Sequence, residues 1–174
     1  MKPLILTCLL FLLTACITID GKRYIEDPID FDLYTFFNGE VQAWGIVQDR
    51  SGNLVQRFEV DIVGSVSDGE LVLDETFSYT LGEGVEKRIW TINNEQSGFR
   101  GGAGDILGQA AGVDYGNAFY WAYEMDLPVG DTEYRVNFED WIWAFDDEVL
   151  VNRSYIRKFG VVFAEVTIFM QKRS

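Results

Sequence analysis

The chain has 174 residues, a formal net charge of −14 and no histidine, and its length suits one domain with a single core. A strongly acidic chain is a poor partner for nucleic acid, which is bound through many lysine and arginine contacts to phosphate. The lack of histidine excludes Ser-His-Asp hydrolysis, Cys-His catalysis and histidine-ligated zinc.

The first sixteen residues have the anatomy of a bacterial lipoprotein signal. Lys2 supplies a positive start, residues 4–13 are an apolar stretch, and Thr14-Ala15 are the small residues that a signal peptidase needs before its cut. A transmembrane helix needs about 20 apolar residues, so this stretch is too short to be one. Leu13-Thr14-Ala15-Cys16 resembles a lipobox. We therefore predict that residues 1–15 are a signal peptide and that Cys16 is lipidated.

The residues after Cys16 indicate how the domain is held. In lipoproteins an Asp after the cysteine favours the inner membrane, and here that residue is Ile17, so the resemblance implies an outer-membrane lipoprotein that faces the periplasm. Residues 16–29 are charged and aperiodic, which predicts a lipidated tether. Cys8 would be lost with the signal, so the mature domain has no disulfide, catalytic thiol or cysteine-ligated metal. The alternative is an ordinary secretory signal cut near Ala15, with a cysteine following by chance.

The main domain, residues 30–174, begins with helix signals. Asp30 is a candidate N-cap, Leu33, Phe36 and Phe37 have helical spacing, and Gly39 follows as a stop signal. We expect a short helix over residues 30–39 that packs over one end of the main fold.

From Val41 to Met170 the pattern changes to runs of β-branched and aromatic residues. Short links favour antiparallel neighbours, and closure of such a sheet removes its exposed edges. The prediction is an all-β, up-and-down antiparallel β-barrel of about eight to ten strands, lipocalin-like, with room for one small ligand. We count about nine strands, with a helical turn over residues 154–159 that Gly160 ends. The expected turns are 49–53, 67–69, 82–84, 94–98, 128–131 and 146–147.

One charged residue lies in the apolar phase of its strand. Leu71, Leu73, Phe77 and Tyr79 alternate with polar residues, and Glu75 shares their phase and should point inward. A buried carboxylate is costly unless it is paired. Arg88, in phase with Trp90, is the expected partner.

The chain from Phe36 to its C-terminus is similar to a family of proteobacterial lipoproteins known only as domain of unknown function 3833. The resemblance rests on the segments Phe37-Asn38-Gly39, 43–52, Leu73-Asp74-Glu75, Gly104-Asp105, Gly116-Asn117-Ala118, Asp140-Trp141, Asn152-Arg153 and Lys158-Phe159-Gly160. It implies a lipocalin-like barrel and, from neighbouring genes that resemble fatty-acid-modifying enzymes, a link to lipid. True lipocalins carry Gly-x-Trp near the first strand, whereas this chain has Trp44-Gly45, so the resemblance to lipocalins is architectural.

Charged and aromatic residues in the patterned strands are the candidates for a ligand pocket. They form either the polar end of a cavity or an internal ion-pair network, and the aromatic residues among them form either a pocket wall or ordinary core. The candidate pocket residues are Trp44, Glu75, Phe77, Arg88, Trp90, Asp105, Asn117, Phe119, Trp121, Asp140, Trp141, Asn152 and Arg153.

Other patterns have simpler interpretations. Glu139 and Asp140 are neighbours on a strand and face opposite sides, so they cannot form a two-carboxylate catalytic pair. The acidic stretch 146–148 is interpreted as a solvated hairpin tip rather than a calcium loop. Gly98, Gly102 and Gly104 have a nucleotide-loop spacing without a βαβ unit, so we interpret them as bulges, corners or close approaches. We expect no metal and no cofactor.

Three functions remain open. The first is a membrane-anchored periplasmic barrel that binds a small hydrophobic or lipid-like molecule. The second is a structural partner of an envelope or lipid-modifying complex. The third is a lipid-acting enzyme that uses a buried carboxylate such as Glu75 or Asp105, although no catalytic set is recognised.

Overall fold

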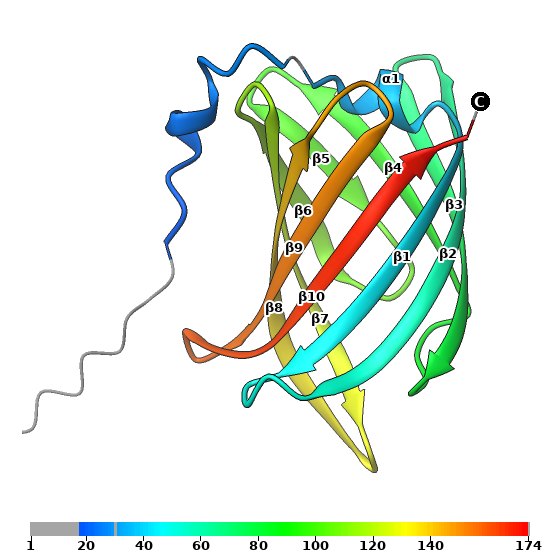
Figure 1. Cartoon of the computed structure of the whole chain (residues 1–174), viewed down its shortest axis with the longest axis vertical. Coiled ribbons are helices and arrows are strands. Elements are labelled where there is room, and N and C mark those ends of the chain that lie inside the picture. Colours follow the sequence, from blue (N-terminus) through cyan, green and yellow to red (C-terminus); the bar gives the residue numbers. More distant parts are fainter. Residues whose placement is uncertain (1–17, 30, 174) are drawn as a thin grey trace, which may run out of the picture.

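The structure, a computed structural model, describes residues 18–29 and 31–173. The predicted signal peptide, Cys16 and the candidate cap Asp30 lie outside the described residues. The described chain is a closed antiparallel barrel in which each strand pairs with its neighbours in sequence and β1 pairs with β10 (Figure 1). The predicted all-β up-and-down barrel is confirmed.

Two short helical segments precede ten strands. They are η1 (Gly21–Tyr24), α1 (Leu33–Phe37), β1 (Gly39–Asp49), β2 (Leu54–Ser67), β3 (Glu70–Leu81), β4 (Lys87–Glu95), β5 (Gly98–Gly102), β6 (Leu107–Asp114), β7 (Ala118–Val129), β8 (Thr132–Ala144), β9 (Val149–Lys158) and β10 (Val161–Lys172).

The predicted helical turn at residues 154–159 is wrong. Residues 149–158 form β9, which pairs with β8 on one side and β10 on the other. The reversal is a tight turn at Phe159 and Gly160, whose φ angles are 52° and 75°. Two successive positive φ values match the twist of a β-hairpin, so β9 and β10 are joined without a helix.

The N-terminal helix is shorter than expected. It spans Leu33–Phe37, and its N-cap is Asp32, whose carboxylate accepts a hydrogen bond from Thr35 N at 2.6 Å. Gly39 is already the first residue of β1. The helix therefore begins two residues later than the predicted N-cap Asp30 implies, with Asp32 as its N-cap.

One end of the barrel is closed by α1. Leu33, Phe36 and Phe37 are buried there, and the Phe37 carbonyl lies against Gly64 of β2, where a Cβ atom would be 1.7 Å from its oxygen. Lys172, at the end of β10, donates through Nζ to the carbonyls of Phe36 at 2.8 Å and Asn38 at 3.0 Å. Because the last carbonyls of a helix lack partners within it, a cation at this position holds α1 on the barrel end.

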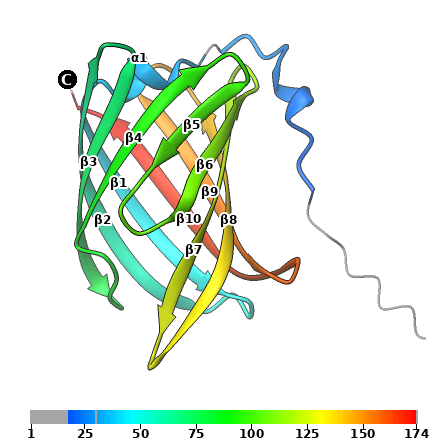
Figure 2. The same cartoon turned by 180° about the vertical axis from the view of Figure 1, so that it is seen from behind.

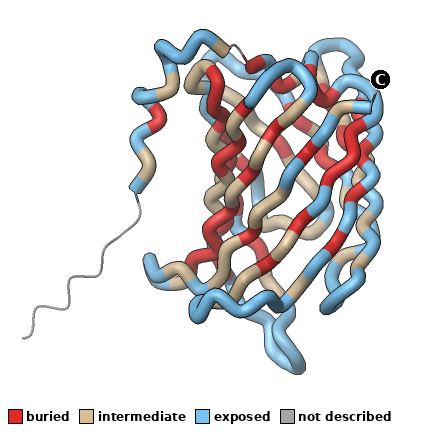
Figure 3. The backbone as a smooth tube through the Cα atoms, in the orientation of Figure 1, coloured by how far each residue is buried: buried red, intermediate tan, exposed pale blue. Residues whose placement is uncertain are grey.

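The opposite end carries the hairpins β1–β2, β3–β4, β7–β8 and β9–β10, which are largely exposed (Figure 3). Along the strands, buried and exposed residues alternate as expected for one inward and one outward face. Figure 2 shows that the β5–β6 hairpin is shorter than its neighbours. The ladder between β3 and β4 ends at Thr76 and Lys87, and just beyond it Phe77 N donates to the Glu86 carbonyl at 2.9 Å. Within the described residues, no helix is long and apolar enough to cross a membrane.

Candidate functional site

The barrel interior holds a cavity of about 1430 Å³. Its walls come from all the long strands, its closed end includes Leu33 and Phe37, and its open end includes hairpin residues such as Gly84, Gly130 and Phe159. The lining is mostly apolar, as in pockets for small molecules. The space is therefore a cup with a closed floor at α1 and a mouth at the hairpins.

Three charged side chains point into this cup at mid-height. On β3, Glu75 has Leu71 and Leu73 on its floor side and Phe77 and Tyr79 on its mouth side. On β8, Asp140 has Ile142 on its floor side and Val136 and Phe138 on its mouth side. Arg88, at the start of β4, is the third. We call these three side chains, together with Asp105 of the β5–β6 connection, the polar layer.

Arg88 pairs with Asp105, which corrects the expected pairing with Glu75. Its Nη2 lies 2.6 Å from Asp105 Oδ2, and its Nε donates to both carboxylate oxygens at 3.0 and 3.1 Å. Asp105 comes from the β5–β6 connection, 17 residues further along the chain than Arg88. Register does place Glu75 opposite Arg88, but the bidentate geometry belongs to Asp105.

Glu75 and Asp140 are buried acids without cations of their own. Burial raises the pKa of Glu75 to about 7, against the opposing effect of Arg88 and with a further increase from Asp105. Burial also raises the pKa of Asp140 to about 7, although the Ser154 hydroxyl and Arg88 lower it. Both side chains keep some accessible surface, but because they line the cup this surface faces the cavity rather than bulk water. Each acid therefore changes charge near neutral pH.

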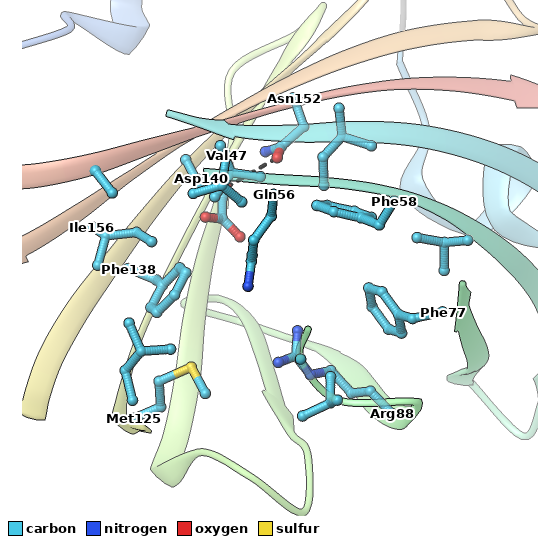
Figure 4. Close-up of a pocket in the computed structure, with 18 of the residues that line it drawn as sticks. Val47, Gln56, Phe58, Phe77, Arg88, Met125, Phe138, Asp140, Asn152 and Ile156 are labelled. Carbon is cyan, nitrogen blue, oxygen red and sulfur yellow. Dashed lines mark hydrogen bonds between the residues drawn. The ribbon is translucent and has the colours of Figure 1, made fainter. Parts of the chain in front are cut away.

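Asp140 also carries an unsatisfied oxygen. Within the described chain, its Oδ1 is shut off from solvent and has no hydrogen-bond partner. The nearby Ser154 hydroxyl donates to Asn152 Oδ1 at 3.0 Å, and Asn152 Nδ2 donates to the Trp141 carbonyl at 3.3 Å. Figure 4 shows Asp140 beside Asn152, with Arg88 across the cavity from both. The polar layer thus spans the barrel from β3–β4 to β8–β9.

Aromatic rings form the floor beneath the polar layer. Trp90 meets Trp121 at 5.7 Å and Tyr123 at 5.2 Å between ring centroids, and Phe119 stacks beside Trp121 at 5.9 Å. The rings fit because Gly112 of β6 has no side chain: a Cβ there would be 2.5 Å from the Trp121 ring. The structure therefore places Trp90, Phe119 and Trp121 inside the barrel, together with Phe77 and Asn152.

Asp105 does not itself line the cavity and is linked to it through Arg88, and four other predicted pocket residues lie elsewhere. Trp44 is on the outer face of β1, 5.9 Å from Phe169 between centroids. Arg153 is on the outer face of β9 and pairs with Glu165 at 2.7 Å. Asn117 is buried in the β6–β7 turn, away from the cavity, and its Oδ1 has no partner among the described residues. Their placement in the pocket is wrong, because strand parity or the turn sends each side chain away from it.

Trp141 is the fourth, and it belongs to an outer aromatic cluster. Its ring lies 5.0 Å from Tyr120, 5.8 Å from Tyr115 and 6.2 Å from Tyr24 of η1. These contacts dock the N-terminal segment on the outside of β8. A smaller cavity of about 440 Å³ lies there, between Thr18–Ile19 and the outer faces of β8 and β9. On that face Glu139 pairs with Arg157 at 2.7 Å, so Glu139 and Asp140 do face opposite sides.

Several interior residues were not among the candidates. Phe58, Tyr79, Met125, Phe138, Ser154 and Gln56 all line the cavity. For most of them the signal was present, since they share the strand phase of Glu75, Trp121, Asp140 or Asn152. Gln56 shares the phase of Phe58 on β2, but because it is polar, the hydrophobic alternation did not mark it as an inward residue.

The comparisons with known proteins identify a family but give no activity. No curated protein matches the chain. One family profile, described as a protein of unknown function, matches residues 10–172 and so spans both the barrel and the N-terminal segment. On that match the chain belongs to the family of proteins of unknown function DUF3833.

Proposed function

We propose that this protein is a lipoprotein of the bacterial envelope that binds a small, largely apolar molecule, such as a lipid, inside its barrel. The observation that carries the proposal is the cavity of about 1430 Å³, closed at α1, open at the hairpins and lined mostly by apolar side chains. A space of this size exceeds the range of about 300–1,000 Å³ common for small-molecule pockets. An acyl chain fits such a space better than a compact polar metabolite does.

The mouth of the cup supports entry of an apolar ligand. Val55, Val129 and Phe163 line the cavity there and remain exposed, and Phe159 at the tip of the β9–β10 turn is 92 % exposed. Apolar side chains grouped at a rim are unusual on a surface that meets only water. The apolar lining thus continues from the interior to the mouth, where Glu83 and Lys158 also line the opening.

The lipobox-like start of the sequence supports the location. Cys16 would bring two or three acyl chains, enough for stable anchoring, and the absence of Asp after it favours the periplasmic face of the outer membrane. The negative charge of the chain disfavours adsorption to anionic lipid. A covalent anchor would therefore be what keeps this domain at the membrane.

Native mass spectrometry tests the binding function. The domain from residue 18 onward is purified, stripped of lipid, refolded, and mixed with a lipid extract of the producing bacterium. We expect one bound species per barrel. Met125→Trp and Phe138→Trp together place larger rings on the mouth side of the cavity and should reduce the fraction of protein with bound lipid at least fivefold. The matched control is Val113→Trp, on an exposed position of β6.

A barrel that stays empty with every lipid class would contradict ligand binding and favour a structural partner in the envelope. Circular dichroism of each variant separates loss of the cavity from loss of the fold. A variant that is folded but still binds would show that the ligand sits elsewhere.

A further inference from the structure

The polar layer restricts what the bound molecule can carry at its polar end. Building on the proposed binding function, we infer that the ligand has an uncharged, hydroxyl- or ester-bearing polar end that meets Arg88, Glu75 and Asp140, and that the cavity disfavours a free anion such as a carboxylate.

Arg88 supplies the donors. Its Nε and Nη2 are used by Asp105, whereas Nη1 has no hydrogen bond to any residue in the described part of the chain. Figure 4 shows the guanidinium directed into the cavity. The contact with Asp105 fixes the plane of the group, and rings of Phe77 and Trp90 lie 5.8 and 6.0 Å from its Cζ. A ligand oxygen placed in the cavity can therefore accept from a preoriented N–H group.

The charges of the layer oppose an anion. Asp105 already balances Arg88, and the groups that face the remaining two acids are Arg88, Asp105, Tyr79, Tyr123 and Ser154. No second cation among the described residues faces them, since Lys158 lines the mouth, with its Nζ 4.2 Å from the Tyr134 ring centre. An anionic head would meet an arrangement that is neutral when both acids are protonated and negative when they ionise.

A hydroxyl or ester satisfies the same groups without that penalty. Its oxygen accepts from Arg88 Nη1, and a hydroxyl proton is donated to Glu75 or Asp140 when either is ionised. When they are protonated, the two carboxyls donate to the ligand oxygen instead. The raised pKa values of both acids make either arrangement accessible near pH 7. Neutral ligands can therefore be held over the whole range in which the acids titrate.

The placement of the layer also orients the ligand. Trp90, Phe119 and Trp121 fill the floor below it, while the mouth side offers Phe58, Val136, Phe138, Met125 and Ile156. A polar end at mid-height thus directs its alkyl chain toward the mouth. The inferred class is a single-chain or short double-chain neutral lipid rather than a free fatty acid.

Competition binding with chains of equal length tests this inference. An apolar fluorescent probe is displaced by 1-dodecanol, 1-monolauroylglycerol or dodecane-1-sulfonate, whose charge is constant between pH 5.5 and 8. At pH 8 we expect the alcohol and the glycerol ester to displace the probe at concentrations at least tenfold lower than the sulfonate. Sulfonate affinity should rise at least tenfold on lowering the pH to 5.5, and alcohol affinity should change less than threefold.

The double variant Glu75→Gln and Asp140→Asn removes both titrating acids. It should bind the sulfonate at pH 8 as tightly as the unchanged protein does at pH 5.5. Asp74→Asn is the matched control, because Asp74 precedes Glu75 on β3, faces outward and pairs with Lys87 at 3.0 Å. If the double variant does not fold, each single substitution should still reduce the pH dependence of sulfonate binding.

Binding of the sulfonate at pH 8 that equals or exceeds binding of the alcohol would overturn the inference while leaving ligand binding intact. The inference would also be overturned if the affinity for the sulfonate did not change with pH. The same holds if the folded double variant kept the pH dependence of sulfonate binding. Failure of the fluorescent probe and of every chain to bind would instead remove the proposed function, and this inference with it.

Discussion

At the scale of single residues, the polar layer shows how burial and pairing divide roles among similar carboxyls. Asp105 lies beside Arg88 in bidentate contact, while Glu75 and Asp140 face the cavity with burial as the largest influence on their pKa values. The ion pair is partly shielded, with side-chain exposures of 15 % for Arg88 and 26 % for Asp105. The ion pair fixes the orientation of Arg88, while Glu75 and Asp140 can still change their protonation state near neutral pH.

Stability should reflect the raised pKa values of Glu75 and Asp140, about 7 in the folded state against 4.5 and 3.8 for ordinary groups. The folded state holds protons that the unfolded chain has released, so these two acids make stability fall as pH rises from about 4 to 7, and the loss is complete above 7. Glu75→Gln or Asp140→Asn should therefore stabilise the protein at pH 8 by about 1–3 kcal/mol and change it little at pH 4. Urea unfolding at both pH values measures this, and an equal effect at both would contradict it.

Loss of the Arg88 partner should destabilise the fold. Asp105→Asn leaves a mostly buried guanidinium without a counter-charge, and we expect a cost of about 1–3 kcal/mol at pH 7, less than for a fully buried pair. Asp126→Asn is the control, because it removes a similar bidentate contact to Arg135 that is exposed, and such a pair contributes little. Equal effects of the two substitutions in urea unfolding would show that the polar layer is not shielded from water.

At the scale of elements, two hairpins use the same tight turn with different sequences. The β2–β3 turn has Asp68 and Gly69 at φ 53° and 83°, and the β9–β10 turn has Phe159 and Gly160 at 52° and 75°. Asp and Asn tolerate a positive φ, whereas a bulky Phe does so at a cost. Phe159 gains no burial in return, which sets the β9–β10 turn apart as a rim element suited to contact with an apolar partner.

Replacement of the strained residue should stabilise the hairpin. Phe159→Asn matches the preferred turn sequence and should raise the free energy of unfolding by about 0.5–1 kcal/mol. The reciprocal change, Asp68→Phe, should lower it by a similar amount. Thermal unfolding of both variants measures these two changes in stability. A destabilised Phe159→Asn variant would mean that Phe159 packs against the barrel in solution.

At the scale of the whole molecule, the closed sheet determines where the interior can be reached. Pairing of β1 with β10 removes both sheet edges, and the cavity opens at the hairpin end, where Gly84, Gly130 and Phe159 line it. The N-terminal segment lies along the outside of β8, where Tyr24 meets Trp141 and Trp143.

Lipid attachment can be tested at Cys16 with a built-in control. In the producing bacterium, Cys16→Ser should move the protein from the membrane fraction to the soluble periplasmic fraction. Cys8→Ser should have no effect, because we predict that Cys8 is removed with the signal peptide. Mass spectrometry of the N-terminal peptide should show acylation of the native chain. A Cys16→Ser variant that stays with the membrane would contradict the anchor.

The sequence by itself determined the barrel and the inward direction of its main acid. Period-two alternation on β3 is local, because each strand residue points opposite to its neighbour, so Glu75 could be placed inside without coordinates. The same rule implies that only one residue of Asp140-Trp141 and one of Asn152-Arg153 can face the cavity. Their parity became certain only with the register to neighbouring strands.

Only the tertiary structure decided which charges meet and where the cavity opens. Asp105 reaches Arg88 through a connection whose course depends on the short β5–β6 hairpin, and no sequence period describes a connection. The helix predicted at residues 154–159 became strand because pairing on both sides of β9 outweighs local preference. Local alternation gives each side chain its face, while contacts between distant strands give it a partner.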